Sequence, residues 1–318
     1  MTNDRETIVR ILARPGVVIR IRQAGPRKAY KAFLASLGLC AMVGCMNPFG
    51  TNNGGKQPIK DVPMDWQPAW SPDGSTIAYT HHAVLESPED SSDTSGIYLV
   101  GADGTGNRLL IAGGEFPDWS PNCSSLVFNL GTQIYRIDTT GTGLTQLTTG
   151  EKSPYPDWSP DGSEIAYSVT SGDSEGVWLM ESDGSNRRLI RWLGIAPDWS
   201  PDASALTYEQ MVPNHVGPEI YRMTPEGADT TRLTFTDYGA YSPAWSPDGM
   251  KICFASSGSI QVMDSQGGNP EILSCGSQPA WSPDGSEIIY CKSSEDEVRL
   301  WIIAADGTND RRFFTGGK

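Results

Sequence analysis

The sequence repeats one short pattern, Pro-x-Trp-Ser-Pro, six times, and this repetition constrains the fold more than any other feature. The tryptophans of the pattern follow one another at intervals of 36 to 49 residues, at Trp70, Trp119, Trp158, Trp199, Trp245 and Trp281. Periods of this length are typical of propellers and solenoids, in which each repeat is one unit of supersecondary structure. A single architecture must therefore account for all six repeats.

Each repeat carries the same series of strand and turn signals. A turn such as Asp73-Gly74 follows the pattern, then an alternating segment such as Ile77-Ala78-Tyr79, a variable loop and a further apolar segment such as Ile97-Tyr98-Leu99-Val100. A Gly-containing turn and a short fourth segment such as Gln146-Leu147-Thr148 complete the unit. Alternation at period two predicts strands, and Asp-Gly pairs suit tight hairpins. We therefore predict an all-β fold over residues 62–318, a six-bladed β-propeller of four-stranded antiparallel blades.

These landmarks closely resemble the TolB-type propeller repeat, in which P-x-W-S-P-D-G is followed by I-A-Y or I-A-F, I-Y, D-G and L-T. The resemblance covers about Pro63 to Thr315. It implies a periplasmic, non-catalytic propeller that serves as a docking platform in a cell-envelope complex. TolB proteins carry an α/β domain before the propeller, whereas only Met46 to about Val62 precedes the first repeat here after the predicted signal. The chain therefore resembles a lipoprotein form without that domain, which puts a role in a Tol-Pal system in doubt.

The first 44 residues have the features of an export signal. A basic stretch from Arg20 to Lys31 precedes an apolar run from Ala32 to Gly44, which is too short to span a bilayer. Met42-Val43-Gly44-Cys45 resembles a bacterial lipobox, so we predict a lipoprotein signal peptide at 1–44 and lipidation of Cys45. Residues 45–61 are predicted to be a flexible tether. The alternative is an ordinary secretory signal with a coincidental Cys, and both interpretations export the protein to the periplasm or the cell surface.

The charge balance excludes one class of partner. Lys and Arg number 24 against 38 Asp and Glu, which gives a net charge of -14, and cleavage before Cys45 would leave -20. Nucleic-acid binding requires basic surfaces, so no nucleic-acid partner is expected. So acidic a chain is also not expected to adhere to an anionic membrane surface by charge, and membrane attachment should come only from the lipid anchor.

The sequence leaves the state of the cysteines open. An exported location permits disulfides, and four cysteines allow three pairings. Buried free thiols are an equally good interpretation. The cysteines concerned are Cys123, Cys253, Cys275 and Cys291.

Residues that carry chemistry are sparse. Only His81, His82 and His215 are present, too few and too scattered for the clusters that catalytic metal sites use. A match to G-x-S-x-G at 172–176 is followed by a strand signal rather than by the helix that a nucleophile elbow requires. We therefore predict a non-enzymatic protein without metal or cofactor, which binds an envelope protein or peptide. The alternative is a propeller hydrolase or lyase acting on envelope carbohydrate or peptide.

One asymmetry among the repeats points to a binding site. The residue between Pro and Trp is Ala in three repeats but Asp118, Asp157 and Asp198 in three successive ones. The pattern opens the innermost strand of each blade, so these inner-strand carboxyls should lie on one arc of a central channel. They are predicted to attract a basic peptide or to hold a cation. The alternative is that Asp simply fills a position beside channel water.

The two ends of the ring are expected to differ. The first and third turns of each blade share one face, where acidic turn residues should form a rim. These residues are Asp73, Asp161, Asp202, Asp248 and Asp284, together with Asp103, Asp183, Glu226 and Asp306. The other face should carry the variable loops, including 80–96 and 209–219, where recognition tends to occur. The motif tryptophans should pack between blades, whereas Trp66 and Trp192 fall outside the register and are candidates for a partner surface.

Overall fold

The computed structural model describes residues 11–12, 18–19, 63–83, 94–294 and 297–313. The chain divides into two compact units, Met1–Gly44 and Cys45–Lys318. In the first unit, β1 (Ile11–Leu12) pairs with β2 (Val18–Ile19) in antiparallel register. The predicted lipidation site at Cys45 and the tether at 45–61 lie outside the described residues, so the signal peptide, the tether and the lipid stay predictions. No helix in the described ranges is long and apolar enough to cross a membrane.

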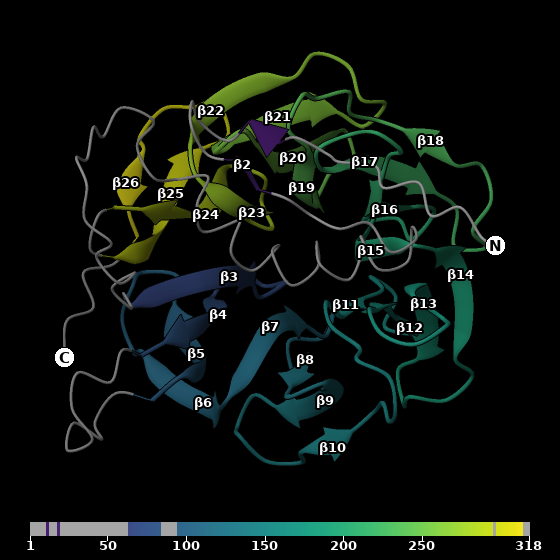
Figure 1. The fold of residues 1–318 in the computed structure, drawn as a ribbon. Coiled ribbons are helices and arrows are strands. Elements are labelled where there is room, and N and C mark those ends of the chain that lie inside the picture. The colour runs from purple at the N-terminus through teal and green to yellow at the C-terminus, as the bar shows by residue number, and fades with distance from the viewer. Residues whose placement is uncertain (1–10, 13–17, 20–62, 84–93, 295–296, 314–318) are drawn as a thin grey trace. The chain divides into compact units, whose positions relative to one another are not determined.

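All of the regular structure described in the second unit is β-sheet (Figure 1). Four sheets have four strands each, joined in sequence order as antiparallel neighbours. They are β7 (Gly114–Trp119), β8 (Ser125–Leu130), β9 (Gln133–Asp138), β10 (Thr145–Gln146); β11 (Asp157–Trp158), β12 (Glu164–Val169), β13 (Gly176–Glu181), β14 (Arg188–Trp192); β15 (Gly194–Trp199), β16 (Leu206–Met211), β17 (Pro218–Met223), β18 (Thr231–Arg232); and β19 (Ala240–Trp245), β20 (Lys251–Ser256), β21 (Ser259–Asp264), β22 (Glu271–Cys275).

The remaining eight strands form a single sheet. Its members are β23 (Ser277–Trp281), β24 (Glu287–Ser293), β25 (Val298–Ala304), β26 (Arg311–Arg312), β3 (Met64–Trp70), β4 (Thr76–His82), β5 (Gly96–Gly101) and β6 (Arg108–Ala112). The two ends of the repeat region meet here, because β25 pairs with β3 in parallel at Val298 and Met64. The Val298 N–H donates to the carbonyl of Pro63 at 3.1 Å.

The prediction of six four-stranded blades is therefore wrong. The all-β propeller is confirmed, but the described residues form only four separate four-stranded sheets together with one eight-stranded sheet. The physical reason is the start of β3, where Met64 pairs with His82 of its hairpin partner β4 and also with Val298 of β25. This backbone pairing joins the first repeat to the last.

The first strands of the repeats contact one another in cyclic order, from β3 through β7, β11, β15, β19 and β23 and back to β3 (Figure 1). The motif tryptophans pack where neighbouring sheets meet, as predicted. Trp119 lies in one buried cluster with Ile97 and Leu99 of the preceding repeat and Leu126 and Phe128 of its own. Because each motif indole fills the space between two neighbouring sheets, the repeat of Trp along the sequence gives the same contact between successive sheets around the propeller.

Two faces of this ring follow from the strand directions. We call the face with the Ser-Pro-Asp-Gly turns, between the first and second strands of each repeat, the turn face. We call the opposite face, where second strands connect to third strands and fourth strands to the next repeat, the loop face. Part of one long loop, residues 84–93, lies outside the described residues.

The innermost strands contain a feature that the strand pattern did not predict. The residue before each motif Pro has a positive φ, between 49° and 58°, at Gln67, Phe116, Tyr155, Ala196, Ser242 and Gln278. Five of these residues lie at a register shift with the second strand. They are β-bulge residues in a conformation that non-Gly residues rarely adopt.

None of the four cysteines in the described part of the chain forms a disulfide. Cys253 and Cys291 are buried, Cys123 is half-buried and Cys275 is exposed. The structure therefore supports the thiol interpretation of these four residues.

Candidate functional site

The inner-strand carboxyls occupy equivalent positions on β7, β11 and β15, and each reaches into the next repeat. Asp118 Oδ2 accepts the backbone N–H of Trp158 at 2.7 Å. Asp157 Oδ2 accepts the N–H of Trp199 at 2.6 Å, and Asp198 Oδ2 accepts that of Trp245 at 2.9 Å. These bonds tie each innermost strand to its neighbour, so the three side chains have a structural role that the sequence did not reveal.

Their surroundings work against ionisation. The three side chains are half-buried. Loss of water around them raises the pKa of Asp118 to about 7 and that of Asp198 to about 8. Burial also raises the pKa of Asp157 well above its usual range, and the charges of Asp118 and Asp198 raise it further. The predicted arc therefore exists as a group of mutually interacting carboxyls. Near neutral pH the group holds protons, which weakens its attraction for a cation.

A cation site was one reading of this arc. Among the described residues, no group of three His, Cys, Asp or Glu side chains is arranged to hold a metal ion. Whether the arc binds a cationic segment of a partner stays a prediction.

A second polar layer lies beside the bulges. Thr80 Oγ1, Asn129 Oδ1 and Ser168 Oγ each accept the N–H of the bulge residue in the next repeat, at 3.2, 3.1 and 2.9 Å. At the equivalent position of the fourth repeat, Glu209 Oε1 accepts the N–H of Ser242 at 2.8 Å. Glu209 is 5% exposed, and burial raises its pKa to about 7.

Sequence reasoning missed this layer, although a signal was present. The residue after the aromatic of each second strand should be apolar if it only fills the core, yet it is polar in four repeats, at Thr80, Asn129, Ser168 and Glu209. Aromatic bulge residues lie in the same region, since the rings of Phe116 and Tyr155 are 4.4 Å apart in an edge-to-face arrangement. Trp66, a candidate for a partner surface, contacts the Phe116 ring at 6.2 Å and packs against the core.

The turn face carries a different kind of carboxylate. In the first repeat, Asp73 Oδ1 accepts hydrogen bonds from Ser71 Oγ at 2.6 Å, Ser75 N at 3.0 Å and Ser75 Oγ at 2.8 Å. The hydrogen bond from the preceding Ser is the largest of the effects that lower the pKa of this Asp and of its counterparts. These turn carboxyls are Asp73, Asp161, Asp202, Asp248 and Asp284, all exposed. Exposed groups with lowered pKa values stay ionised near neutral pH, so the predicted acidic rim has a fixed negative charge.

Asn122 replaces Asp in the second repeat and keeps the same geometry. Its Oδ1 accepts from Ser120 Oγ at 2.8 Å, Ser124 N at 3.0 Å and Ser124 Oγ at 2.7 Å. The turn therefore requires the acceptor oxygen and not the charge.

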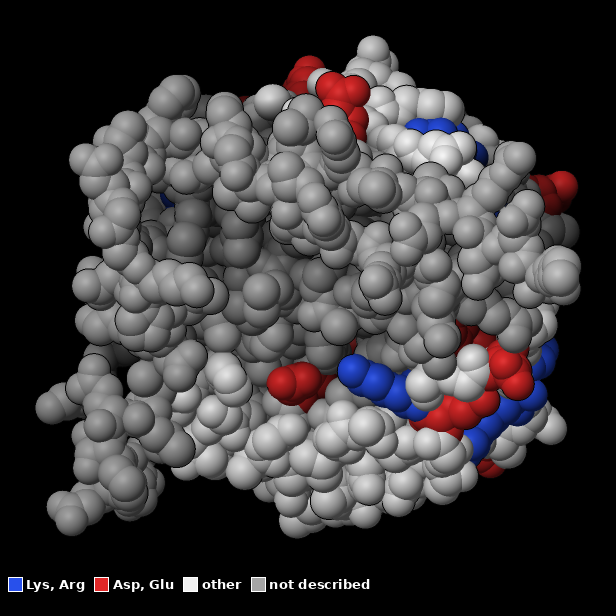
Figure 2. Space-filling view, in the orientation of Figure 1, with Lys and Arg blue, Asp and Glu red and all other residues white. Residues whose placement is uncertain are grey.

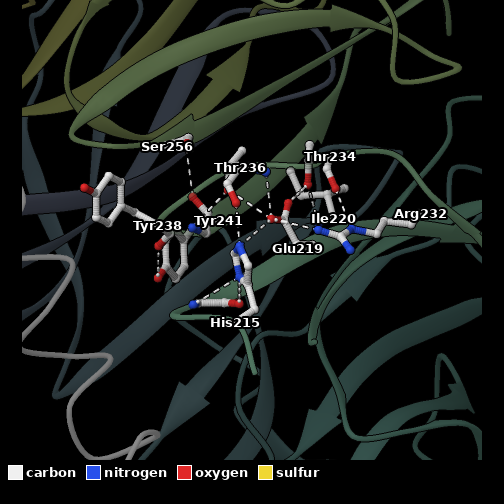
Figure 3. A network of polar contacts seen from close by, with 11 residues as sticks. His215, Glu219, Ile220, Arg232, Thr234, Thr236, Tyr238, Tyr241 and Ser256 are labelled. Atoms are coloured by element: carbon white, nitrogen blue, oxygen red, sulfur yellow. Dashed lines mark hydrogen bonds and ion pairs between the residues drawn. The ribbon is translucent and has the colours of Figure 1, made fainter. Parts of the chain in front are cut away.

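On the loop face, a buried carboxylate organises the connections around the fourth repeat (Figure 3). Glu219 is fully buried at the start of β17, and its Oε1 accepts from Thr236 N at 2.8 Å and from Thr236 Oγ1 at 3.1 Å. Thr234 Oγ1 donates to the other carboxylate oxygen. Arg232 Nη2 lies 3.2 Å and His215 Nε2 lies 3.3 Å from Glu219 Oε1.

Large apolar side chains are exposed around this network. Phe235 is 77% exposed and Tyr238 64% exposed, both in the connection from β18 to β19, and Val216 in the loop from β16 to β17 is 59% exposed. Trp192, the last residue of β14, is 57% exposed, and Leu193, between β14 and β15, is 45% exposed. We call these five residues the loop-face apolar patch. The structure thus places Trp192, unlike Trp66, on the surface.

The charges in view in Figure 2 do not form a field of one sign. Acidic and basic side chains lie side by side over the region near β11 to β14. Mixed charge of this kind contrasts with the uniformly acidic set of turn carboxyls.

Comparison with known proteins points to one family. The sequence profile of the TolB β-propeller domain matches residues 156–317, half of the chain. A protein assigned as TolB from Agrobacterium tumefaciens has 26% sequence identity and a TM-score of 0.59, and the match covers 66% of this chain and 84% of that one. TolB from Acinetobacter baumannii has 23% identity and a TM-score of 0.63 over 74% of this chain, which spans 62% of that protein's length.

More distant matches show the fold alone. An oligogalacturonate lyase in complex with manganese has a TM-score of 0.52 at 13% identity, and the match covers 76% of this chain and 89% of the lyase. A comparison with curated proteins finds no match.

Proposed function

Because this chain belongs to the TolB β-propeller domain family, we propose that it is a lipid-anchored, extracytoplasmic propeller that binds an envelope protein or peptide and performs no chemistry. Family membership supports a binding scaffold. The lipobox-like sequence ending at Cys45 supports the anchor and a location in the periplasm or at the cell surface.

The set of turn carboxyls is the observation that carries the proposal of a binding surface. Five exposed Asp side chains have pKa values lowered by hydrogen bonds within their own turns, so their charge is fixed and their positions are held by the backbone. A preorganised ring of like charges favours a partner that presents Lys and Arg side chains, and it accelerates the encounter with such a partner. The partner proposed is therefore a basic protein or peptide that docks on the turn face.

The inner-strand carboxyls are the second candidate for the same role. Their pKa values of about 7 and about 8, at Asp118 and Asp198, leave them partly protonated near neutral pH. Each also uses one oxygen to hold the next repeat. Both facts favour the turn face as the stronger docking surface.

The experiment uses the replacement that the chain itself contains. Because Asn122 builds the same turn without charge, the triple variant Asp161→Asn, Asp202→Asn and Asp248→Asn should keep the fold and lose three charges. In-cell crosslinking through a tagged full chain should then capture less of the partner, and capture by the wild type should fall as salt rises. Asn122→Asp adds one charge in the same frame and should increase capture.

A matched variant separates the two sites. Asp118→Asn, Asp157→Asn and Asp198→Asn together should leave capture unchanged if the partner docks on the turn face. If this variant loses capture and the turn variant does not, the inner-strand carboxyls are the binding site. Capture that is insensitive to both variants and to salt would contradict recognition of a basic partner. Cys45→Ala should release the protein from the membrane fraction, and a wild type that is already soluble would contradict the anchor.

The enzymatic alternative has less support. The manganese-bound lyase shares the fold at 13% identity, and no observation in the described residues favours a hydrolase or lyase activity for this chain.

A further inference from the structure

The loop-face apolar patch departs from the repeat pattern. The tight connections between repeats carry small residues at Ala112-Gly113 and Cys275-Gly276, but Trp192-Leu193 lies at the corresponding place between β14 and β15. Leu193 adopts a φ of 57°, close to the 71° of Gly113. A branched side chain in this left-handed region costs stability that Gly would avoid. The exposed Leu193 therefore occupies a backbone conformation that disfavours it.

Hydrogen bonds to Glu219 hold the connection that carries the patch residues Phe235 and Tyr238 (Figure 3). Glu219 accepts hydrogen bonds from Thr234 and Thr236, on either side of Phe235. Thr236 Oγ1 in turn accepts the N–H of Gly239 at 2.9 Å, next to Tyr238.

Arg232 completes the support. Its guanidinium lies 4.4 Å from the centre of the Phe235 ring and 3.2 Å from Glu219. The connection from β18 to β19 is thus hydrogen-bonded at Thr234, Thr236 and Gly239, and Phe235 and Tyr238 are exposed on it. Exposed apolar clusters of this kind mark sites that contact another apolar surface.

The path of the chain indicates which surface that is. The first strand, β3, begins at Met64 on the loop face, and the 17 residues 46–62 connect it to Cys45. If these residues form the flexible tether that the sequence predicts, their r.m.s. end-to-end distance is about 20 to 25 Å. An acyl chain on Cys45 would therefore keep the loop face close to the bilayer, at a high effective concentration.

Charge and residue type agree with that orientation. The turn carboxyls lie on the opposite face, where an anionic lipid surface would repel them least. Trp, Tyr and Phe are the side chains that settle at the boundary between lipid headgroups and acyl chains, with Leu and Val inserted beside them.

We propose that the loop-face apolar patch, Trp192, Leu193, Val216, Phe235 and Tyr238, rests in the interface of the lipid bilayer and orients the turn face toward the aqueous compartment. This proposal rests on the lipid anchor of the proposed function for its orientation. The patch itself is a separate property of the folded chain, and it can be measured whether or not Cys45 carries lipid.

The test places one fluorophore on each face. Tyr238→Cys labels the patch, and Met250→Cys is the matched control, because Met250 is 68% exposed in a turn of the turn face. Both are made in the full chain with Cys123→Ser and Cys275→Ser, which removes the half-buried and the exposed thiol among the described residues, and are labelled with bimane. The protein, processed by the cell and purified, is combined with vesicles of phosphatidylethanolamine and phosphatidylglycerol whose acyl chains are brominated.

Bimane at position 238 should lose most of its emission in brominated vesicles, while bimane at position 250 should keep it. Adding Phe235→Ser to the Tyr238→Cys protein should restore emission in part, and circular dichroism should show the fold unchanged because Phe235 is exposed. Equal emission at the two positions in vesicle-bound protein would overturn the proposal. So would crosslinking of position 238 to a protein in cells, because the patch would then be a protein-binding surface.

Failure of the anchor gives a different result. If the wild type does not float with vesicles at low lipid, the lipid on Cys45 is refuted, and the same measurement is repeated with Cys45→Ser added, at rising lipid concentration. Selective quenching at position 238 then supports the patch without the anchor. Absence of quenching at both positions overturns the patch as well.

Discussion

Asp157 and Asp161 stand four residues apart in one copy of the repeated pattern, yet the structure shifts their pKa values in opposite directions. Asp157 faces the inside of the ring, where burial and two neighbouring carboxyls raise its pKa. Asp161 lies in the exposed turn, where hydrogen bonds from Ser159 and Ser163 lower its pKa. The same residue type thus forms two kinds of site. Asp157 is removed from water without a neighbouring cation, whereas Asp161 stays in water and accepts hydrogen bonds.

The two sets of carboxyls are expected to have different roles, one in holding the repeats together and the other in binding a partner. The inner-strand carboxyls bond to the backbone of the next repeat and belong to the joints of the ring. The turn carboxyls accept hydrogen bonds within their own turns, as Asp161 does from Ser159 and Ser163, so their charge is available to a partner. Changes on the inner side should therefore affect stability, and changes on the turn side should affect binding.

The largest loss of stability is expected when a tryptophan that packs between two sheets is truncated. Trp199 is 7% exposed and packs between the sheets of the third and fourth repeats. Trp199→Ala should lower the free energy of unfolding by about 3 to 5 kcal/mol, measured in urea, because it leaves a cavity between two sheets. Trp192→Ala, on the surface, should change it by less than about 0.5 kcal/mol. Equal losses would remove the distinction between the two tryptophans.

A smaller loss is expected when the inner carboxyl is removed. Asp157→Ala leaves the Trp199 N–H without its acceptor and should cost about 1 to 3 kcal/mol of unfolding free energy. Asp157→Asn keeps an acceptor oxygen and removes the charge, so it should be neutral or stabilising at pH 7. Urea unfolding of the pair tests this, and a destabilisation by Asn as large as that by Ala would show that the charge itself is required.

The two sets of carboxyls also predict opposite responses to pH. Raised pKa values, about 7 at Asp118 and about 8 at Asp198, mean that the folded state binds more protons than the unfolded state above pH 4, so stability should fall as pH rises from about 4 to about 8. The turn carboxyls have lowered pKa values, so they stabilise the folded state above about pH 4. This contribution to stability should be lost as pH falls below about 4.

Urea midpoints across pH should therefore show a maximum in the mildly acidic range. The triple variant Asp118→Asn, Asp157→Asn and Asp198→Asn should flatten the decline toward pH 8 and leave the acid limb in place. The remaining decline should be attributable to Glu209, whose pKa is about 7, and Glu209→Gln should remove it. A triple variant that declines as steeply as the wild type would contradict the assignment of these carboxyls.

Short sequence patterns predicted the turns and the packing between neighbouring sheets, but not the strand pairing between the first and the last repeat. The Pro-x-Trp-Ser-Pro pattern and the Asp-Gly turns depend on neighbouring residues, and the packing of Trp119 between sheets follows from its repetition. The eight-stranded sheet depends on one backbone pairing between Met64 and Val298, which no local pattern encodes. The positive φ of Phe116 is likewise opposed to local preference and arises from the bulge between Glu115 and Asp118.

The binding role of the inner-strand carboxyls stays a prediction, and their contacts were not predicted. The sequence placed Asp118, Asp157 and Asp198 together because their positions in the repeat are equivalent. It did not show that each accepts a Trp N–H, because that contact depends on the distance between two repeats. Glu219 gave no sign in the sequence, since a Glu at the start of a strand is usually solvated and its burial depends on Arg232 and Thr236 from a later connection.

The smallest effect on stability is expected on the turn face. Asp161→Asn should keep the hydrogen bonds from Ser159 and Ser163, as Asn122 does with its own neighbours, and should change the free energy of unfolding by less than about 0.5 kcal/mol at pH 7. Asp161→Ala removes the acceptor and should cost about 1 kcal/mol, the net contribution typical of a hydrogen-bonded group. Urea unfolding of the two variants separates the acceptor from the charge. If Asn proved as costly as Ala, the charge would be holding the turn together, and Asp161 could no longer be treated as free to serve a partner.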